Sequence, residues 1–145
     1  MSDTPTLTGQ DIGQAERATR ALLDAVLAET QTTFHQSVVL NLLANTPSPA
    51  EFDSLVQRMT HGLKIDRPTA FSAIDEVVAK GLASRSGHPE SLAFTTAGDR
   101  RFRAIRRGID RIAERLYGDL APEDLATTHR ILAIVTERAN AELAA

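Results

Sequence analysis

The sequence contains no cysteine, and aromatic residues make up only 4% of its 145 residues. The lack of cysteine excludes disulfide bonds, thiolate metal sites and redox sensing through cysteine oxidation. No apolar run approaches membrane-spanning length, and the first residues lack the basic and apolar regions of a secretory leader. We therefore expect a soluble, cytoplasmic protein that has no membrane partner.

The chain also lacks the residue patterns of enzymes and metal sites. There is no glycine-rich phosphate loop, no nucleophile elbow, and no coherent pairing of histidine with serine and aspartate. The scattered histidines include no pair four residues apart, so only folding could bring a zinc site together. They are His35, His61, His88 and His129. We expect no catalytic residue, no metal and no cofactor.

Charge is distributed unevenly along a chain whose length and 42% hydrophobic content suit one compact subunit. The net charge is −3 and both ends are acidic, but residues 64–111 contain ten basic and six acidic residues, a balance of plus 4. This local surplus favours a polyanionic partner, because the local field governs affinity better than the total charge does. The alternative is that these residues decorate solvated helix faces.

The middle of the chain begins with a pattern typical of an amphipathic helix. Ser48 is the predicted N-cap, Pro49 the first helical residue, and Glu51 stands three residues after the serine, as in a capping box. Apolar residues then recur every three or four positions, at Phe52, Leu55, Val56, Met59 and Leu63. Gly62 suits the end of this helix.

A second helix follows after only about two residues. Asp66 is its predicted N-cap, and Pro68 is tolerated because first-turn amides have no intrahelical acceptor. The helix should end at Lys80-Gly81, a cation followed by a C-terminal glycine. Its core side comprises Ala70, Ala73, Ile74 and Val77. A connection this short favours a sharp helix-turn-helix corner.

Residues 82–85 and 91–95 are too short for helices and flank a turn that contains Gly87 and Pro89. They predict a β-hairpin. A helix-turn-helix followed at once by a hairpin is a winged helix-turn-helix, and in such folds the second helix enters the major groove of duplex DNA.

Amphipathic helices also frame this segment. They are predicted over residues 12–27, 34–43, 96–116 and 122–143. The third should begin at a threonine cap, Thr95 or Thr96, and break at residues 117–119. The apolar faces of the terminal helices favour contact with a second subunit; the alternative is that they cover the subunit's own core.

Four short motifs, in this order, resemble the successive signatures of the MarR family of bacterial transcription regulators. They are residues 59–75, Lys80-Gly81-Leu82 with Arg85, residues 94–98 and residues 120–125. The resemblance covers nearly the whole chain. It implies a mainly α fold with a small β-hairpin wing, the winged helix-turn-helix in about residues 34–98, and dimerisation helices in residues 9–33 and 99–145. It also implies a homodimer on a palindromic operator.

We expect the DNA-binding residues in the second helix and the wing. They are Lys64, Arg67, Pro68, Thr69, Ser72, Arg85 and His88. Arg67 could pair with guanine O6 and N7, and the hydroxyls could reach bases or phosphates. Alternatively, Arg67 pairs with a nearby carboxylate, the hydroxyls are ordinary exposed groups, and Phe71 closes the core. Family wings carry an aspartate, a spacer and an arginine, which residues 87–91 lack, so reading of the minor groove is in doubt.

A cluster of arginines follows the wing. Arg100, Arg103 and Arg107 share one helix face, where they could contact phosphates. The favoured interpretation is an ion-pair network, within or between subunits, with the acidic terminal helices.

Many proteins that the chain resembles release DNA when a small, often anionic aromatic effector enters a crevice between the dimerisation helices and the winged domain. Arg17, Arg20, His35 and Gln36 are candidates to line it, although ion pairing or surface exposure explains each equally well.

The sequence therefore predicts a ligand-responsive homodimeric repressor that binds DNA sequence-specifically. The rival hypothesis is a winged-helix dimer that acts as a protein-interaction module or as an antagonist of another regulator. Asp75, Glu76, the missing wing arginine and the overall acidity favour that rival. A small-molecule-binding protein without DNA function is a third hypothesis.

Overall fold

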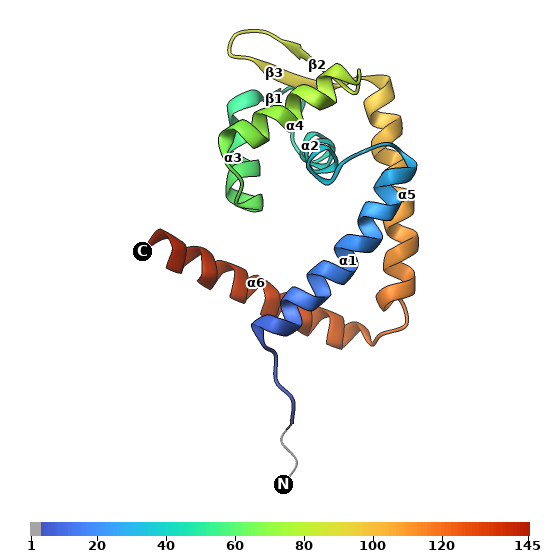
Figure 1. Ribbon diagram of the computed structural model, residues 1–145, viewed down its shortest axis with the longest axis vertical. Coiled ribbons are helices and arrows are strands. Elements are labelled where there is room, and N and C mark those ends of the chain that lie inside the picture. The colour runs from blue at the N-terminus through green and yellow to red at the C-terminus, as the bar shows by residue number, and fades with distance from the viewer. Residues whose placement is uncertain (1–3) are drawn as a thin grey trace. The chain divides into compact units, whose positions relative to one another are not determined.

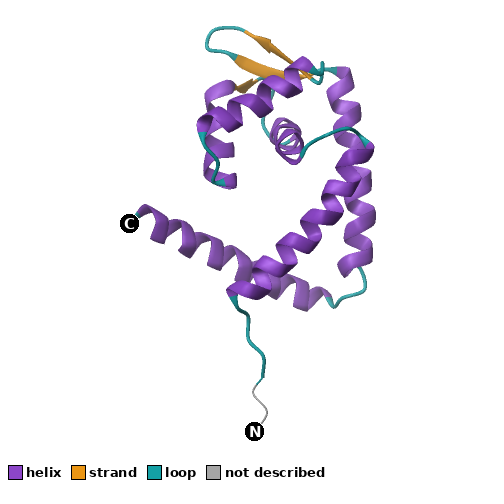
Figure 2. Cartoon of the chain, viewed as in Figure 1, coloured by secondary structure: helices purple, strands orange, loops and turns teal. Residues whose placement is uncertain are grey.

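The computed structural model describes residues 4–145 and is mainly helical, with one small antiparallel sheet (Figures 1 and 2). The elements are α1 (Gly9–Glu29), α2 (Phe34–Ala44), β1 (Ala50–Glu51), α3 (Phe52–Leu63), α4 (Arg67–Ala79), β2 (Ala83–Ser86), β3 (Ser91–Phe94), α5 (Thr96–Tyr117) and α6 (Pro122–Ala144). This confirms the predicted fold class. The chain divides into two compact units at Ile109, within α5.

The sheet confirms the predicted hairpin and adds a strand to it. Strands β2 and β3 pair antiparallel, with Arg85 opposite Leu92 and Ser86 opposite Ser91. The third strand, β1, pairs with the other edge of β3, so the order is β1-β3-β2. None of the helices in residues 4–145 has the length and hydropathy to cross a bilayer.

The prediction that Ser48 caps the first central helix is wrong. Helix α3 begins at Phe52, and its N-cap, Glu51, makes no side-chain capping bond. Ala50 and Glu51 are extended because they pair with β3, and the Phe52 amide donates to the Glu90 carbonyl at 2.9 Å. Strand pairing with a distant segment thus overrides a local capping pattern.

The corner between α3 and α4 places α4 as the sequence predicts. Three residues, 64–66, connect the helices, and Lys64 adopts the left-handed conformation with φ 57°. Asp66 caps α4 by accepting a hydrogen bond from the Thr69 amide at 2.8 Å. At the other end, Lys80 is the C-cap, and Gly81 follows with φ 75°, which glycine adopts without a Cβ clash. Both predicted helix ends are confirmed.

The hydrophobic core lies under α4. Its largest fully buried side chains come from α4 itself and from the segments packed around it. They are Leu27, Val39, Leu40, Leu55, Val56, Met59, Ile74, Val77, Leu82 and Leu92. The predicted core side of α4 is confirmed, because Ala70, Ala73, Ile74 and Val77 are at most 2% exposed. The opposite face of α4 must therefore point to solvent.

Helix α5 starts at the predicted threonine cap and is tied closely to the hairpin. The Thr95 hydroxyl accepts a hydrogen bond from the Gly98 amide at 3.1 Å and donates one to the Gly81 carbonyl at 2.6 Å. Gly98 is buried here because the backbone of Leu82 comes so near that no side chain would fit.

Replacing Gly98 with alanine tests this close approach. The new Cβ would lie 1.8 Å from the Leu82 carbonyl oxygen, so backbone must move. We expect Gly98→Ala to lower the free energy of unfolding by about 3 kcal/mol, measured by thermal denaturation. The matched control is Gly62→Ala in α3, where nothing lies within 4 Å and a gain of about 0.5–1 kcal/mol is expected. Equal stability of the two variants would contradict the close approach.

Candidate nucleic-acid interface

The first turns of α4 present the predicted base-reading residues to solvent. Arg67, Pro68 and Ser72 are exposed, and Thr69 is half-buried. The Thr69 hydroxyl donates to the Asp66 carboxylate at 2.5 Å, and the Thr69 amide donates to the same carboxylate at 2.8 Å. These two bonds, the one from the side chain first, hold the pKa of Asp66 below its usual value of 3.8. The N-terminus of α4 is thus fixed by its own cap.

Two phenylalanines extend this surface towards the wing. Phe71 of α4 stacks on Phe52 of α3, with ring centroids 5.1 Å apart. The Arg67 guanidinium carbon lies 5.3 Å from the Phe71 centroid, and that of Arg85 lies 5.5 Å from the Phe52 centroid. Phe71 therefore packs against a neighbour and holds Arg67 near the start of α4 by a cation–π contact.

Arg85, a predicted DNA contact in β2, is engaged within the subunit. Its guanidinium forms an ion pair with Asp75 of α4, and its Nε lies 3.2 Å from the Glu90 carboxylate. The wing is thereby tied to α4. His88 is exposed in the turn of the hairpin, and exposed Lys64 donates from Nζ to the His61 carbonyl at 2.6 Å.

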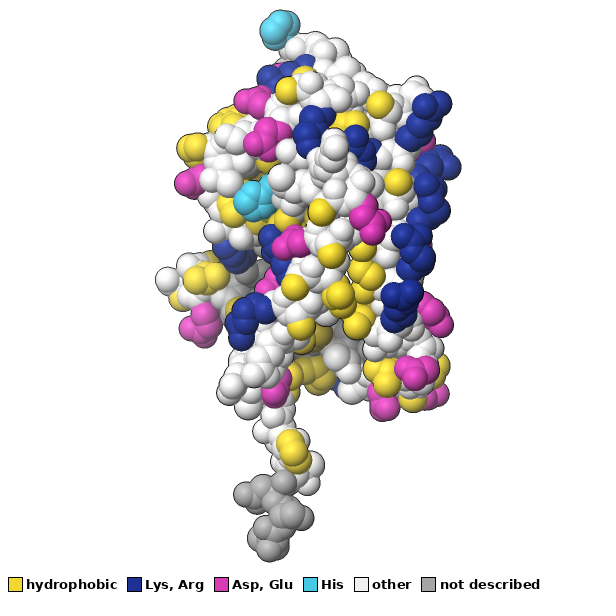
Figure 3. Space-filling model, turned by 45° about the vertical axis from the view of Figure 1, so that its right-hand side comes forward, with side chains coloured by type: hydrophobic (Ala, Val, Ile, Leu, Met, Phe, Trp, Pro, Cys, Tyr) yellow, Lys and Arg dark blue, Asp and Glu magenta, His cyan; other side chains and the backbone are white. Residues whose placement is uncertain are grey.

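The structure divides the positive charge of residues 64–111 in an unexpected way. The helix-turn-helix and wing, residues 64–95, carry four basic residues against Asp66, Asp75, Glu76 and Glu90, and are neutral. The whole surplus belongs to α5. Figure 3 shows Lys and Arg side chains in a column along α5, at the right of the view.

The α5 arginines differ in how they are engaged. Arg103 pairs with Asp99 on the same helix, with Nε 3.0 Å from Oδ2, and Arg101 donates to the Thr32 hydroxyl at 3.2 Å. Within residues 4–145, no salt bridge joins Arg100 or Arg107 to a carboxylate. The Arg103 pair lies within α5, and the predicted ion-pair network with the acidic terminal helices stays a prediction.

Gln36, a candidate effector contact, lies in a buried polar cluster that joins α2 to α4. Its side chain is 3% exposed, and its Oε1 accepts hydrogen bonds from the Thr33 amide and from Lys80 Nζ at 2.9 Å. Its Nε2 donates to Glu76 at 2.9 Å, and Lys80 also donates to the Gln31 carbonyl. We call this group, Gln31, Thr33, Gln36, Glu76 and Lys80, the polar clasp. It fixes the C-terminal half of α4 to the start of α2.

An apolar cavity of about 240 Å³ lies among α1, α2 and α5. Its lining consists of Leu23, Phe34, Ser37, Val38, Leu40, Asn41, Phe102, Ile105, Arg106 and Ile109. The sequence did not mark these residues as a site, because most of them are apolar residues at helical spacing, as in an ordinary core. They form a cavity only when α1, α2 and α5 are packed together.

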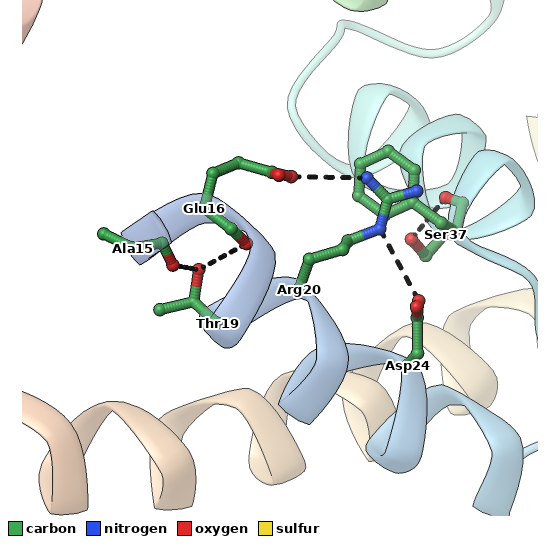
Figure 4. Close-up of polar contacts among 7 residues, drawn as sticks. Ala15, Glu16, Thr19, Arg20, Asp24 and Ser37 are labelled. Atoms are coloured by element: carbon green, nitrogen blue, oxygen red, sulfur yellow. Dashed lines mark hydrogen bonds and ion pairs between the residues drawn. The ribbon is translucent and has the colours of Figure 1, made fainter. Parts of the chain in front are cut away.

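Arg20, another candidate effector contact, covers the ring of cavity-lining Phe34, with its guanidinium carbon 3.2 Å from the ring centroid. Figure 4 shows Arg20 between Glu16 and Asp24, to which its nitrogens lie at 3.6 and 3.5 Å. The Asp24 contact is a charge–charge contact without hydrogen-bond geometry. His35 lies 6.0 Å from Phe34 between ring centroids, and Arg17 is exposed on α1 beside Gly13.

Residues 4–145 bring together no group of three or more His, Asp or Glu side chains suited to hold a metal ion. The arrangement offers an exposed polar helix face on α4, a wing paired with α4, a basic helix and an apolar cavity.

Solved structures share this arrangement over nearly the whole chain. A MarR protein from Peptoclostridium difficile has a TM-score of 0.77 and 16% identity, with 97% of each chain covered. A MarR-family transcriptional regulator from a Rhodococcus species has a TM-score of 0.72 and 16% identity, with 91% of this chain and 98% of that one covered. NadR in complex with 4-hydroxyphenylacetate has a TM-score of 0.70 and 19% identity, with 94% and 98% covered.

No protein-family model matches the sequence, and no curated protein matches it. The structural neighbours nevertheless show that the chain has the winged-helix fold of MarR-family transcription regulators, as its motifs predict. The Rhodococcus neighbour is described as a transcriptional regulator.

The cap of α4 gives a pH-dependent prediction. A carboxylate whose pKa is lowered by folding stabilises the folded state above its unfolded pKa, and this contribution disappears as the pH falls through the folded value. Asp66→Ala should therefore lower the Tm by its full amount above about pH 5, and the difference from wild type should shrink below about pH 3.8.

Asp66→Asn is the control, because asparagine keeps an acceptor at the N-cap but does not ionise. The difference in Tm between the asparagine and alanine variants should not depend on pH. A constant difference between wild type and Asp66→Ala across the acid range would contradict the assignment.

Proposed function

We propose that the chain is a cytoplasmic, MarR-type homodimer that binds duplex DNA sequence-specifically and represses transcription until a small anionic aromatic ligand releases it. The observation that carries this proposal is the exposed first turn of α4, with Arg67 and Ser72 outward and the opposite face buried, in a fold shared with MarR-family regulators. In such folds these side chains reach base edges in the major groove.

Dimerisation is supported by apolar surface on α6. No residue of this helix is buried, and several large apolar side chains on one face are exposed: Leu132 by 39%, Val135 by 38% and Leu143 by 72%. A monomer gains nothing from such a face, whereas a second copy would remove it from water. A two-fold dimer places its two α4 helices in successive major grooves, about 34 Å apart, so the operator would be palindromic.

The ligand proposal rests on the cavity of α1, α2 and α5. Its walls are mainly apolar and include the ring of Phe34, so a small aromatic ligand fits its chemistry. NadR, which shares the fold, is known in complex with 4-hydroxyphenylacetate. Its volume of about 240 Å³ favours a ligand of about one ring.

Helix α2 connects this cavity to the recognition helix. Phe34 and Ser37 line the cavity, while Gln36, between them, belongs to the polar clasp that holds α4. A ligand that displaces the start of α2 would therefore move the C-terminal half of α4. This gives a physical route from ligand binding to loss of the operator.

A protein-interaction module remains the second candidate. It is favoured by the neutral charge of residues 64–95 and by Arg85, which Asp75 and Glu90 already occupy. A module of this kind would keep its protein partner when Arg67 is removed.

Removal of Arg67 tests the DNA-reading role. By fluorescence anisotropy, the wild-type chain should prefer the DNA that flanks its own gene over a random duplex. Arg67→Ala should weaken binding to the preferred duplex by about 1–3 kcal/mol and leave random binding nearly unchanged. Arg130→Ala on α6 is the control and should bind as wild type does. A wild-type chain that fails to distinguish the two duplexes would contradict the regulator proposal.

A cavity-filling substitution tests the ligand. The Ser37 hydroxyl donates only to the Phe34 carbonyl in the same helix. Ser37→Leu therefore adds bulk to the cavity and removes no contact between helices. Aromatic carboxylates such as 4-hydroxyphenylacetate should raise the Tm of wild type and should weaken operator binding. At a ligand concentration 100 times the Kd, the free energy of unfolding should rise by about 2.7 kcal/mol. Ser37→Leu should bind the operator but show neither response.

Thr19→Leu is the matched control, because Thr19 donates its hydroxyl to a backbone carbonyl of α1 and is exposed outside the cavity. It should respond as wild type does. An unchanged ligand response in Ser37→Leu would place the ligand elsewhere.

A further inference from the structure

The positive charge of this protein is concentrated away from the helix that would read DNA. Residues 64–95 are neutral, whereas α5 carries seven arginines against three acidic residues, a balance of plus 4. Phosphate contacts supply most of the sequence-independent affinity of a DNA-binding protein. A neutral helix-turn-helix and wing cannot supply it by net charge, so another surface must attract the duplex.

Three arginines form a straight row on α5. Arg100, Arg103 and Arg107 are spaced by three and four residues, which places them on one helix face at intervals of about 4.5 and 6 Å along the axis. We call this row the arginine ridge. The opposite face of α5 carries Phe102, Ile105 and Ile109, which pack on the core. The ridge therefore points away from the core, and all three arginines are exposed.

The ridge is available to a ligand, unlike the arginine of the wing. Arg85 pairs with Asp75 of α4 and with Glu90 of the hairpin turn, whereas residues 4–145 offer Arg100 and Arg107 no salt bridge. Arg103 is 70% exposed in its pair with Asp99. An exposed pair of residues four apart contributes little stability, so a phosphate can replace the carboxylate at small cost.

We infer that the arginine ridge is a second DNA-binding surface, which holds the phosphate backbone of the operator flank. This inference rests on the proposed function. A row of like charges on one helix is matched by a linear polyanion, and the arginine fork pairs well with phosphate oxygens. Duplex DNA is favoured over a second copy of the chain, because one phosphate strand satisfies every member of the row.

The ridge begins close to the C-terminal end of α4. Helix α5 begins two residues after β3, and Thr95 and Gly98 fasten its first turn to Gly81 and Leu82 at the end of α4. The ridge and α4 thus belong to the same compact unit. In this arrangement α4 chooses the sequence, and the ridge supplies salt-dependent affinity.

The test uses the full chain and a duplex of about 30 base pairs from the DNA flanking its gene, with a random duplex of equal length. Arg100→Gln/Arg107→Gln is compared with Arg130→Gln/Arg138→Gln, which removes the same charge from exposed positions on α6. Anisotropy titrations over a range of salt concentrations give the slope of log Kd against log salt. Arg100→Lys/Arg107→Lys keeps the charge and checks for rescue.

The ridge variant should weaken binding to both duplexes by the same factor. Its salt slope should fall by about 0.9 for each lost phosphate contact, hence by about 2 if one subunit's ridge contacts DNA and about 4 if both do. The lysine variant should retain most of the slope. A ridge variant with the affinity and slope of the α6 control overturns the inference.

The two proposals fail in different ways. If wild type binds both duplexes equally but the ridge variant still loses slope, the specific regulator is overturned and the ridge stands. If wild type prefers the flanking DNA and the ridge variant keeps the full slope, the ridge is overturned and the regulator stands. A wild-type chain that binds no duplex overturns both.

Discussion

The burial of one side of α4 is the constraint on which the other features depend. Ala70, Ala73, Ile74 and Val77 are at most 2% exposed and lie over side chains of α2 and α3. Small residues at two of these positions let the helix come close to its neighbours. Because this side is fixed inward, Ser72 on the opposite side points to solvent, and Arg67 is exposed as the first residue of α4. The polar clasp adds a second restraint at the other end of the helix, where Gln36 and Lys80 meet.

The predicted base-reading residues and the surplus of positive charge lie on different helices, α4 and α5. The first turn of α4 has few base-reading groups, and the wing arginine Arg85 is committed to Asp75 and Glu90. The surplus of basic over acidic residues lies instead on α5. A regulator built in this way would depend on phosphate contacts beside the helix-turn-helix, and its affinity would be unusually sensitive to substitutions that touch no base.

Features written in local sequence could be predicted, and those that depend on distant partners could not. The caps of α4 at Asp66 and Lys80-Gly81 were correct, because capping bonds join residues three or four apart. The cap at Ser48 was wrong, because β1 pairs with β3 about 40 residues later in the chain. The engagement of Arg85 depends on how the hairpin lies against α4, and no spacing rule contains that angle.

The candidate site shows the same division. The outward face of α4 followed from periodicity alone, but the cavity needed three helices to be placed together, and the apolar residues that line it look like ordinary core in the sequence. Gln36 was named in the sequence only as a candidate effector contact, and its bonds to Glu76 and Lys80, 40 and 44 residues away, appear only in the fold. The arginine cluster after the wing was visible in the sequence, and the exposure of Arg100, Arg103 and Arg107 on α5 appears in the fold.

Hydroxyl-radical footprinting of the wild-type chain on the DNA that flanks its gene tests the central claim most directly, because it reports which sugars the bound protein shields. The account predicts two protected patches related by two-fold symmetry, centred about one helical turn or 34 Å apart, with further backbone protection outside each patch where the ridge lies. A single patch, or even protection along the whole duplex, would contradict a dimer that places two α4 helices in successive grooves.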